Sequence, residues 1–311
     1  MTAAWRHRAA VGVAVSTFGL VVAGGLVTST GSGLAVPDWP LSFGQVFPRM
    51  EGGVLFEHGH RLIATTVGLL TIGLAVLLQR TERRAWVRRL GWTALGAVVV
   101  QGLLGGLTVK LQLPDAVSVS HAGLAQIFFS LTVTLAVVTA PGWMGASDPV
   151  PAPGAAATRL LALVTALAVY AQVLLGAIVR HTGAGLAIPD FPLAFGRLVP
   201  PLSTPLVLYQ FAHRAFALVV TALIVTTSLR VLRRHGDQPA LVRPAILLVV
   251  LVGWQIFLGA LTIWARRAVV PTTAHVAVGA LLLATSVALV LESHRALAPV
   301  AVRNMAPQAA G

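Results

Sequence analysis

Four of the nine histidines in this chain recur as two matched pairs. His60 in the segment EHGHR corresponds to His213 in QFAHR, 153 residues later, and His121 in SHAGLAQ corresponds to His275 in AHVAVGA, 154 residues later. Imidazole binds metals and carries protons near neutral pH. All four histidines lie in apolar stretches, where an ionisable side chain is costly and by default functional. The recurrence therefore predicts two equivalent sites with two histidines each.

Two histidines per site limit the metal chemistry that fits. Zinc usually takes four protein ligands, or three and a water, and copper would have to collect all four histidines where the two copies meet. Haem fits the count, because the macrocycle supplies four nitrogens and the protein only axial ligands. Arg61 and Arg214, each directly after a histidine, are candidates to pair with haem propionates. Structural hydrogen bonding by the histidines and ordinary interfacial positioning of the arginines remain the alternatives.

A fifteen-residue loop also occurs twice. Residues 30–44 read TGSGLAVPDWPLSFG and residues 182–196 read TGAGLAIPDFPLAFG, with eleven identical positions. Further along, QGLLGGLTV at 101–109 corresponds to QIFLGALTI at 255–263. Matches at a nearly constant offset indicate an internal duplication.

The composition places both copies in a membrane. Hydrophobic residues make up 57% of the chain and charged residues 10%, whereas soluble proteins have about 25% charged residues. Stretches of roughly twenty apolar residues, enough to span a bilayer, lie near 9–29, 59–79, 90–109, 120–140, 160–180, 207–229, 245–265 and 273–291. We therefore expect an all-α integral membrane protein whose eight transmembrane helices form two four-helix bundles. Each half has an even number of helices and keeps its orientation, which predicts a parallel repeat.

The expected halves are residues 1–140 and 158–311, joined by a Pro/Ala/Gly-rich linker at 141–157. Arginine-rich short loops stay cytoplasmic, and fourteen arginines fall on one side of the eight helices: Arg6, Arg8, Arg80, Arg83, Arg84, Arg88, Arg89, Arg159, Arg230, Arg233, Arg234, Arg243, Arg295 and Arg303. This predicts a cell-membrane protein with both termini cytoplasmic and the histidine sites towards the outer side. It also explains the net charge of +13 without nucleic acid. His7, His235 and His294 lie in the basic segments and are expected to be solvated.

Together, TGSGLAVPDWPL, EHGHR, QGLLGGLTV, SHAGLAQ, QFAHR and TAHVAVGA resemble the haem A synthase family over nearly the whole chain. The resemblance implies an oxidoreductase that converts the C8 methyl group of haem O to the formyl group of haem A. Successive hydroxylations and loss of water from a gem-diol would produce haem A for cytochrome oxidase. It further implies a resident haem b on His213 and His275, and a substrate site bounded by His60 and His121 with Glu57 as a catalytic residue.

This reading implies several partners and leaves two alternatives. Haem O synthase is an expected partner because haem O is insoluble, an electron donor is required but not identified, and lipid surrounds the helices. A diheme b-type electron-transfer cytochrome would use the same four histidines without needing Glu57. A transporter or insertase built on a parallel repeat would need no haem chemistry. Few charges apart from Glu57 lie within the apolar stretches, which argues against a proton-coupled carrier.

The chain departs from the family in its loops. Bacterial relatives often carry a cysteine pair in each duplicated loop, whereas this chain has no cysteine. The positions with the same seven-residue spacing hold Ala35, Ser42, Ala187 and Ala194. Disulfide bonds and thiol chemistry are thus excluded. We expect prolines and aromatic packing to hold the loops, with Asp38 and Asp190 as structural turn residues.

Overall fold

A computed structural model describes residues 3–145 and 149–299. Residues 146–148 of the predicted linker and 300–311 of the predicted C-terminal half, including Arg303, lie outside the described residues. Eight described helices are long and apolar enough to cross a membrane, which confirms the all-α integral membrane class. They are α1 (Ala3–Ser29), α2 (Gly53–Thr81), α3 (Ala85–Lys110), α4 (Asp115–Val138), α6 (Ala155–His181), α7 (Pro205–Arg234), α8 (Pro239–Trp264) and α9 (Val269–Ala296).

Most of these helices extend beyond the apolar stretches that predicted them. The stretch 207–229 lies within α7, which continues to Arg234. Helices continue through polar residues at their ends, because the backbone hydrogen bonds persist after the apolar run stops. Two predicted ends were too long: the stretch 120–140 passes the end of α4 at Val138, and 245–265 passes the end of α8 at Trp264.

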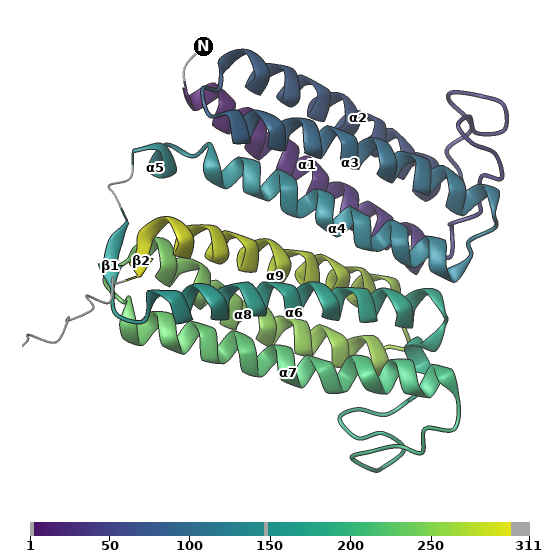
Figure 1. The fold of residues 1–311 in the computed structure, drawn as a ribbon. Coiled ribbons are helices and arrows are strands. Elements are labelled where there is room, and N and C mark those ends of the chain that lie inside the picture. Colours follow the sequence, from purple (N-terminus) through teal and green to yellow (C-terminus); the bar gives the residue numbers. More distant parts are fainter. Residues whose placement is uncertain (1–2, 146–148, 300–311) are drawn as a thin grey trace, which may run out of the picture.

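The helices form two groups of four, α1–α4 and α6–α9 (Figure 1). In the first group α1 and α3 each pack on α2 and α4, and in the second α6 and α8 each pack on α7 and α9. Each group therefore closes into a ring around its own core. Buried side chains such as Leu78, Phe128 and Leu135 fill the first core, and Ile224 and Leu248 fill the second.

A seam joins the two groups where α4 packs on α6 and α9 and α1 packs on α9. Two long loops, residues 30–52 between α1 and α2 and residues 182–204 between α6 and α7, project from the same end of the molecule (Figure 1). We call this the loop end. Both repeats of the fifteen-residue motif therefore lie at one end of the helices.

Short elements lie at the opposite end, where the sequence predicted only a linker. They are the helical turn α5 (Pro141–Met144) and the strand β1 (Val150–Ala152). β1 pairs in parallel with β2 (Leu297–Pro299), which follows α9. The pairing ties the connection between the two groups to the end of the last membrane helix.

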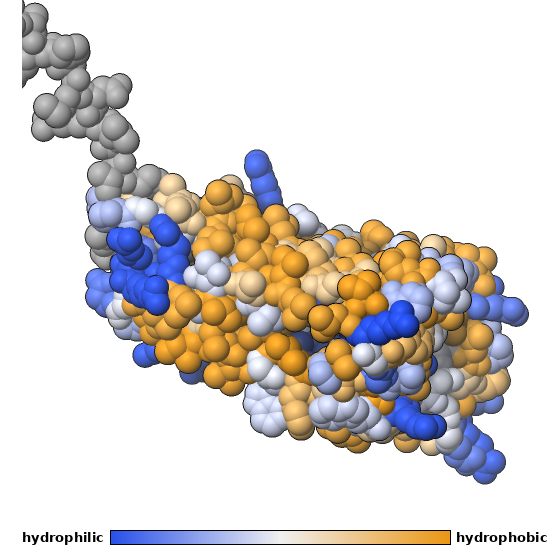
Figure 2. Space-filling view, turned by 90° about the horizontal axis from the view of Figure 1, so that it is seen from below, coloured by the Kyte–Doolittle hydropathy of each residue, from blue (hydrophilic) through white to orange (hydrophobic). Residues whose placement is uncertain are grey.

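The surface agrees with a lipid environment. Figure 2 shows apolar side chains over much of the visible face, with hydrophilic side chains gathered towards the two ends. Large apolar side chains on several helices are more exposed than a soluble protein would tolerate in a continuous band, among them Val15, Leu69, Leu160, Leu167 and Leu218. The multi-pass membrane character is thus visible both in the helices and on the surface.

His235 is buried, contrary to the solvation expected for it. Its side chain is 1% exposed, and its Nε2 lies 3.1 Å from the Thr158 hydroxyl. Burial lowers the pKa of His235, with the positive charge of Arg230 acting in the same direction. The packing of α6 on α7 at this end encloses the imidazole, which the charged sequence around it does not reveal.

Glu82 forms an ion-pair cluster at the same end, between α2 and α3. The carboxylate is 5% exposed and lies 3.0 Å from Nε of Arg84 and 3.2 Å from Nη1 of Arg6 on α1. Burial alone would raise the pKa of Glu82, but hydrogen bonds from Arg84 and the charges of Arg84 and Arg6 outweigh it and lower the pKa to about 2. The cluster fastens the start of α1 to the α2–α3 turn.

We predict that Glu82→Gln lowers the free energy of unfolding at pH 7 by about 2 kcal/mol, since it leaves two arginines without their counter-charge. The folded pKa lies below the ordinary value of 4.5. The ion-pair stabilisation is therefore complete above about pH 4.5 and disappears as the pH falls towards about 2. Thermal unfolding of the detergent-solubilised protein at several pH values measures the difference between variant and wild type.

Glu51→Gln is the matched control. Its partner Arg49 lies 3.9 Å away and is 92% exposed, so the substitution should change stability little. Equal losses in the two variants would contradict a special role for Glu82.

Candidate functional site

The structure brings the predicted histidine pairs together inside the two helix groups. His60 is on α2 and His121 on α4, which lie opposite each other in the first ring. In the second ring His213 on α7 and His275 on α9 have imidazole centroids 6.5 Å apart. Each pair thus comes from two facing helices, an arrangement that bundle proteins use to hold cofactors.

Each imidazole packs against a glycine on a neighbouring helix. A Cβ built on any of these glycines would lie 3.1 to 3.2 Å from Cε1 of the imidazole. The four pairs are Gly24 with His60, Gly105 with His121, Gly176 with His213, and Gly259 with His275. These glycine contacts were not predicted from the sequence. The glycines recur 152 and 154 residues apart, close to the histidine offsets of 153 and 154, and this was the signal that could have linked the two.

His275 has the clearest ligand geometry of the four. Its Nδ1 lies 3.1 Å from the Gln255 carbonyl oxygen. A carbonyl can only accept, so Nδ1 carries the proton, and the unprotonated Nε2 faces the side-chain amide nitrogen of Gln255 at 3.3 Å, which a metal would have to displace. On His213 the Nδ1 atom lies 3.1 Å from Nε2 of Gln172, whose amide also donates to the His213 carbonyl at 2.9 Å. Because an amide nitrogen can only donate, Nδ1 of His213 accepts, so only His275 has the tautomer that leaves Nε2 without a proton.

The first group holds its imidazoles differently. Nδ1 of His60 and Nδ1 of His121 are buried and have no hydrogen-bond partner among the described residues. Gln101 lies against His121, with its Nε2 3.3 Å from Nε2 of the imidazole and 3.0 Å from the His121 carbonyl. Buried polar atoms without partners are costly. Both pairs fit the axial ligands of a haem, but only the second is fixed at Nδ1 by the protein.

The two long loops are built on the same turn. The Asp38 carboxylate accepts hydrogen bonds from the backbone N–H groups of Phe43 and Gly44, at 2.7 and 2.8 Å. Asp190 does the same in the second loop, at 2.8 Å to both N–H groups. These backbone hydrogen bonds lower the pKa of both carboxyl groups. The two aspartates are turn residues, as expected.

Aromatic packing also seats each loop on its helices. The indole of Trp39 lies so close to Gly106 on α3 that a Cβ there would come within 2.6 Å of the ring. In the second loop the smaller Phe191 stands at the corresponding position, and its ring lies edge-on to Trp264 at 6.1 Å. Ala260 replaces Gly106 in that copy. The first copy thus combines a large loop residue, Trp39, with a glycine on the helix, whereas the second combines the smaller Phe191 with an alanine.

The two arginines predicted as propionate contacts are hydrogen-bonded to the loops. Arg61 donates to the carbonyl oxygens of Asp38 and Leu41, at 2.8 and 3.0 Å, and also to that of Val36. Arg214 donates to the carbonyl oxygens of Asp190, Ile188 and Leu193, at 2.7, 2.9 and 3.2 Å. Both guanidinium groups therefore anchor the loops to α2 and α7.

Glu57 and Gln210 perform the same anchoring task with different charge. Oε2 of Glu57 accepts the Val36 N–H at 2.8 Å, and Oε1 of Gln210 accepts the Ile188 N–H at 2.5 Å. Oε1 of Glu57 also forms a salt bridge with Arg61 at 2.6 Å. No hydrogen bond joins Glu57 to a histidine among the described residues. The carboxylate is 4% exposed, at the base of the first loop and one helical turn from His60.

A further polar contact exists only in the first copy. The Ser42 hydroxyl lies 2.8 Å from Nδ1 of His58, and both side chains are buried. The corresponding residues of the second copy, Ala194 and Phe211, belong to a small apolar cluster around Ile188. The first loop is thus held by a hydrogen bond where the second is held by apolar packing.

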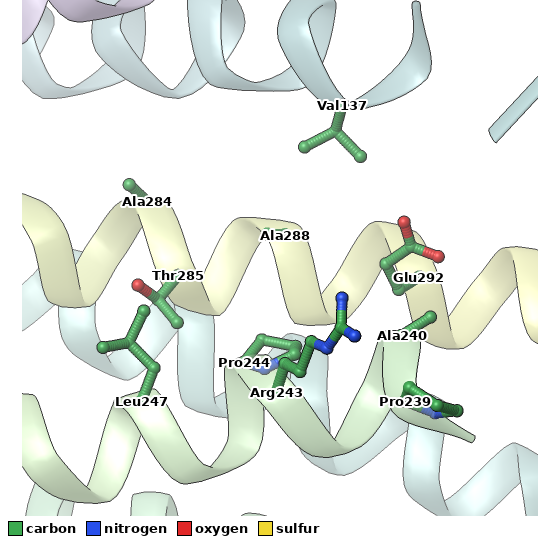
Figure 3. Close-up of a pocket in the computed structure, with 10 residues that line it drawn as sticks. All are labelled: Val137, Pro239, Ala240, Arg243, Pro244, Leu247, Ala284, Thr285, Ala288 and Glu292. Atoms are coloured by element: carbon green, nitrogen blue, oxygen red, sulfur yellow. The ribbon is translucent and has the colours of Figure 1, made fainter. Parts of the chain in front are cut away.

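A groove of about 420 Å³ lies well away from all of these residues, towards the other ends of α8 and α9. Figure 3 shows its mostly apolar lining, with Arg243 and Glu292 as the charged exceptions and Val137 contributed by α4. None of the predicted site residues lines it. The candidate chemistry therefore lies at the histidine pairs near the loop end.

The glycine contacts yield a direct test. Gly259→Ala should displace the His275 imidazole, because the new Cβ would lie 3.2 Å from Cε1, and so reduce the haem retained by the purified protein. Gly253→Ala on the same helix has no atom within 4 Å of the new Cβ and serves as control. Absorption spectra normalised to protein concentration measure both. Full haem retention in the Gly259 variant would contradict the importance of this clearance.

Comparison with known proteins assigns the chain to a family. Residues 7–287 match the COX15-CtaA family of cytochrome oxidase assembly proteins. The heme A synthase of Symbiobacterium thermophilum is 32% identical, over 78% of this chain and 80% of the relative. The heme A synthases of Shouchella clausii and Halalkalibacterium halodurans are 30% and 32% identical, over 75% and 76% of this chain and 78% and 81% of the relatives. By the family match and by these relatives, the chain belongs to the COX15-CtaA family of cytochrome oxidase assembly proteins.

Proposed function

We propose that this protein is a haem A synthase, an oxidoreductase whose substrate is haem O and whose product is haem A. The family match and the relatives named heme A synthase support this function. The structural observation that carries it is the pair of facing histidines in each helix group, each cleared by a glycine. In the proposed reaction the C8 methyl group of haem O is hydroxylated successively, and a gem-diol loses water to leave the formyl group.

The two halves have different roles in this proposal, one as the site of a resident cofactor and the other as the substrate site. His213 and His275 hold a resident haem b, which when bound supplies one-electron chemistry. Support comes from the second group, where the Gln255 carbonyl sets the tautomer of His275 and the Gln172 amide contacts Nδ1 of His213. His60 and His121 bound the haem O site, where Nδ1 has no such partner among the described residues. Histidines that no hydrogen bond at Nδ1 holds in place suit a substrate haem that must enter and leave.

Glu57 is the proposed catalytic residue of the haem O site. Its carboxylate lies about one turn from His60 on α2, where either oxygen can exchange a proton during hydroxylation or loss of water. Arg61 and the Val36 N–H hold the carboxylate in place. The second copy has Gln210 at this position, which anchors its loop without a titratable group. Arg61 and Arg214 position the loops, and contact between their remaining guanidinium surface and haem propionates stays part of the proposal.

Conversion of haem O by the purified protein tests this function. The full chain in detergent, supplied with haem O, a chemical reductant and oxygen, should yield extracted haem with the mass of haem A. Bound haem b without any change in the mass of haem O would instead indicate an electron-transfer cytochrome. A protein that contains and binds no haem would exclude both functions and favour a transporter.

We predict that Glu57→Gln keeps the fold and haem b but loses most conversion of haem O, with accumulation of a hydroxylated intermediate. The loop anchor should survive, because Gln210 makes the corresponding hydrogen bond in the second copy. Liquid chromatography with mass detection of extracted haems measures the products.

Gln210→Glu is the matched control, since it adds the carboxylate at the equivalent anchor of the other half. This variant should convert haem O normally. Normal haem A output from Glu57→Gln would reduce Glu57 to a loop anchor.

We further propose that both termini are cytoplasmic, that the loop end faces outward in the cell membrane, and that a haem O synthase delivers the substrate. An electron donor of unassigned identity completes the reaction. The orientation rests on the arginine-rich turns opposite the loop end. Phe47 and Leu198 in the two loops are 77% and 85% exposed, and the chain has no cysteine of its own.

The orientation predicts a labelling pattern. Phe47→Cys and Leu198→Cys should react with a membrane-impermeant thiol reagent in intact cells. Arg83→Cys, exposed in the turn between α2 and α3, should react only after permeabilisation. The reverse pattern would invert the proposed topology.

A further inference from the structure

The loop ends of the two helix groups differ in charge at aligned positions. Three substitutions between the copies each make the second group more positive: Thr28 to Arg180, Leu113 to Arg267, and Glu57 to Gln210. The structure confirms one alignment directly. Leu113 packs on Gly33 of the first loop, and Arg267 packs on Gly185 of the second, at the same place in the motif. The copies share a scaffold but not its electrostatics.

Arg180 is on α6, near the loop end of the second helix group. It follows Gly176, the glycine that contacts His213, by four residues and so lies on the same helix face one turn nearer the loop end. Its guanidinium crosses the seam and donates to the Gly25 carbonyl oxygen and, at 2.9 Å, to the Ser29 hydroxyl.

The Ser29 hydroxyl also connects Arg180 to α9, the helix that carries His275. The hydroxyl of Thr273, two residues before His275 on α9, donates to the same Ser29 hydroxyl at 3.0 Å. Arg180 also lies within electrostatic reach of His275. The positive charge is therefore beside the imidazole pair, on its loop-end side.

Among the described residues, this charge has no anionic partner. No carboxylate lies within 4.0 Å of Arg180 in residues 3–145 and 149–299, and the nearby charge that acts on it is the positive one of Arg267. Only neutral oxygens accept its hydrogen bonds. Arg180 is partly buried at the edge of an apolar bundle, where a cation without a counter-ion is costly, and this indicates that an anionic ligand group belongs there.

The first group shows the opposite balance. Arg61 is neutralised by Glu57 at 2.6 Å, and the positions that correspond to Arg180 and Arg267 hold the uncharged Thr28 and Leu113. None of these three aligned positions therefore gives the first group an unpaired cation that could bind a carboxylate ligand.

We propose that Arg180, with Arg267, binds the propionate carboxylates of the tetrapyrrole held by His213 and His275. This inference rests on the proposed haem b in the second half. Charge-assisted hydrogen bonds from arginine to carboxylate are among the strong ones, so the second half retains its haem. The first half has no equivalent of this pair, so its haem exchanges. The difference in charge is what separates a resident cofactor from a substrate in two copies of one bundle.

The rate of haem b loss from the purified protein to excess apomyoglobin tests the proposal. Arg180→Gln should accelerate the loss about tenfold or more, as expected when one partner of a buried charge pair is removed. Arg197→Gln, an exposed cation of the second loop, should not. Haem b dimethyl ester lacks the carboxylates, so after reconstitution it should leave the wild-type protein and the Arg180→Gln variant at the same rate.

A role of Arg180 in holding the seam alone makes a different prediction. Ser29→Ala removes the seam hydroxyl and leaves the guanidinium in place, so haem retention should stay at the wild-type level. Equal loss in Ser29→Ala and Arg180→Gln, or faster loss of the ester from the Arg180 variant, would overturn the proposal and leave Arg180 as a seam contact. Wild-type protein that holds no haem b would instead refute the proposed function itself.

Discussion

An imidazole inside an apolar helix bundle must be satisfied, and the rest of this structure follows from that constraint. Burial of a polar atom without a partner costs more than a hydrogen bond gains. Four histidines sit in this position, and each is given room by a glycine on the next helix. Two helices of each ring supply the histidines, and the other two supply the glycines. The four-helix ring thus supplies both the facing histidines and the glycines that make room for them.

The loops depend on the same geometry one turn further out. Arg61 and Arg214 follow the histidines directly and place their guanidinium groups under the loop carbonyls. A change at the histidine turn therefore also disturbs the cover of the bundle. Glu57 and Gln210 complete the anchor, so the position proposed for catalysis is also a structural one. The two copies share this scaffold, but Ser42 and His58 are polar where the second copy has apolar residues, and Glu57 is a carboxylate where the second copy has the neutral amide of Gln210.

Much of this arrangement was predictable from the sequence, because it repeats. The histidine pairing and the eight membrane helices were read from offsets and apolar length, and the structure agrees. The buried His235 and Glu82 were not predicted, because their partners come from helices distant in the sequence. The loop contacts of Arg61 and Arg214 are with backbone carbonyls, which leave no residue-type pattern. The sequence shows that residue 180 is an arginine, but only the structure shows that no carboxylate of the described residues pairs with it.

The central claim is that two copies of one bundle hold haem unequally, and spectra of histidine variants test it most directly. The account predicts that purified His213→Ala and His275→Ala proteins lose the absorption spectrum of haem b with two axial histidines. His60→Ala and His121→Ala should keep most of that spectrum and lose the formation of haem A. Loss of the resident spectrum from the first pair of substitutions alone would agree with the account. Its loss only from His60 and His121 variants, with full retention in the other two, would contradict it.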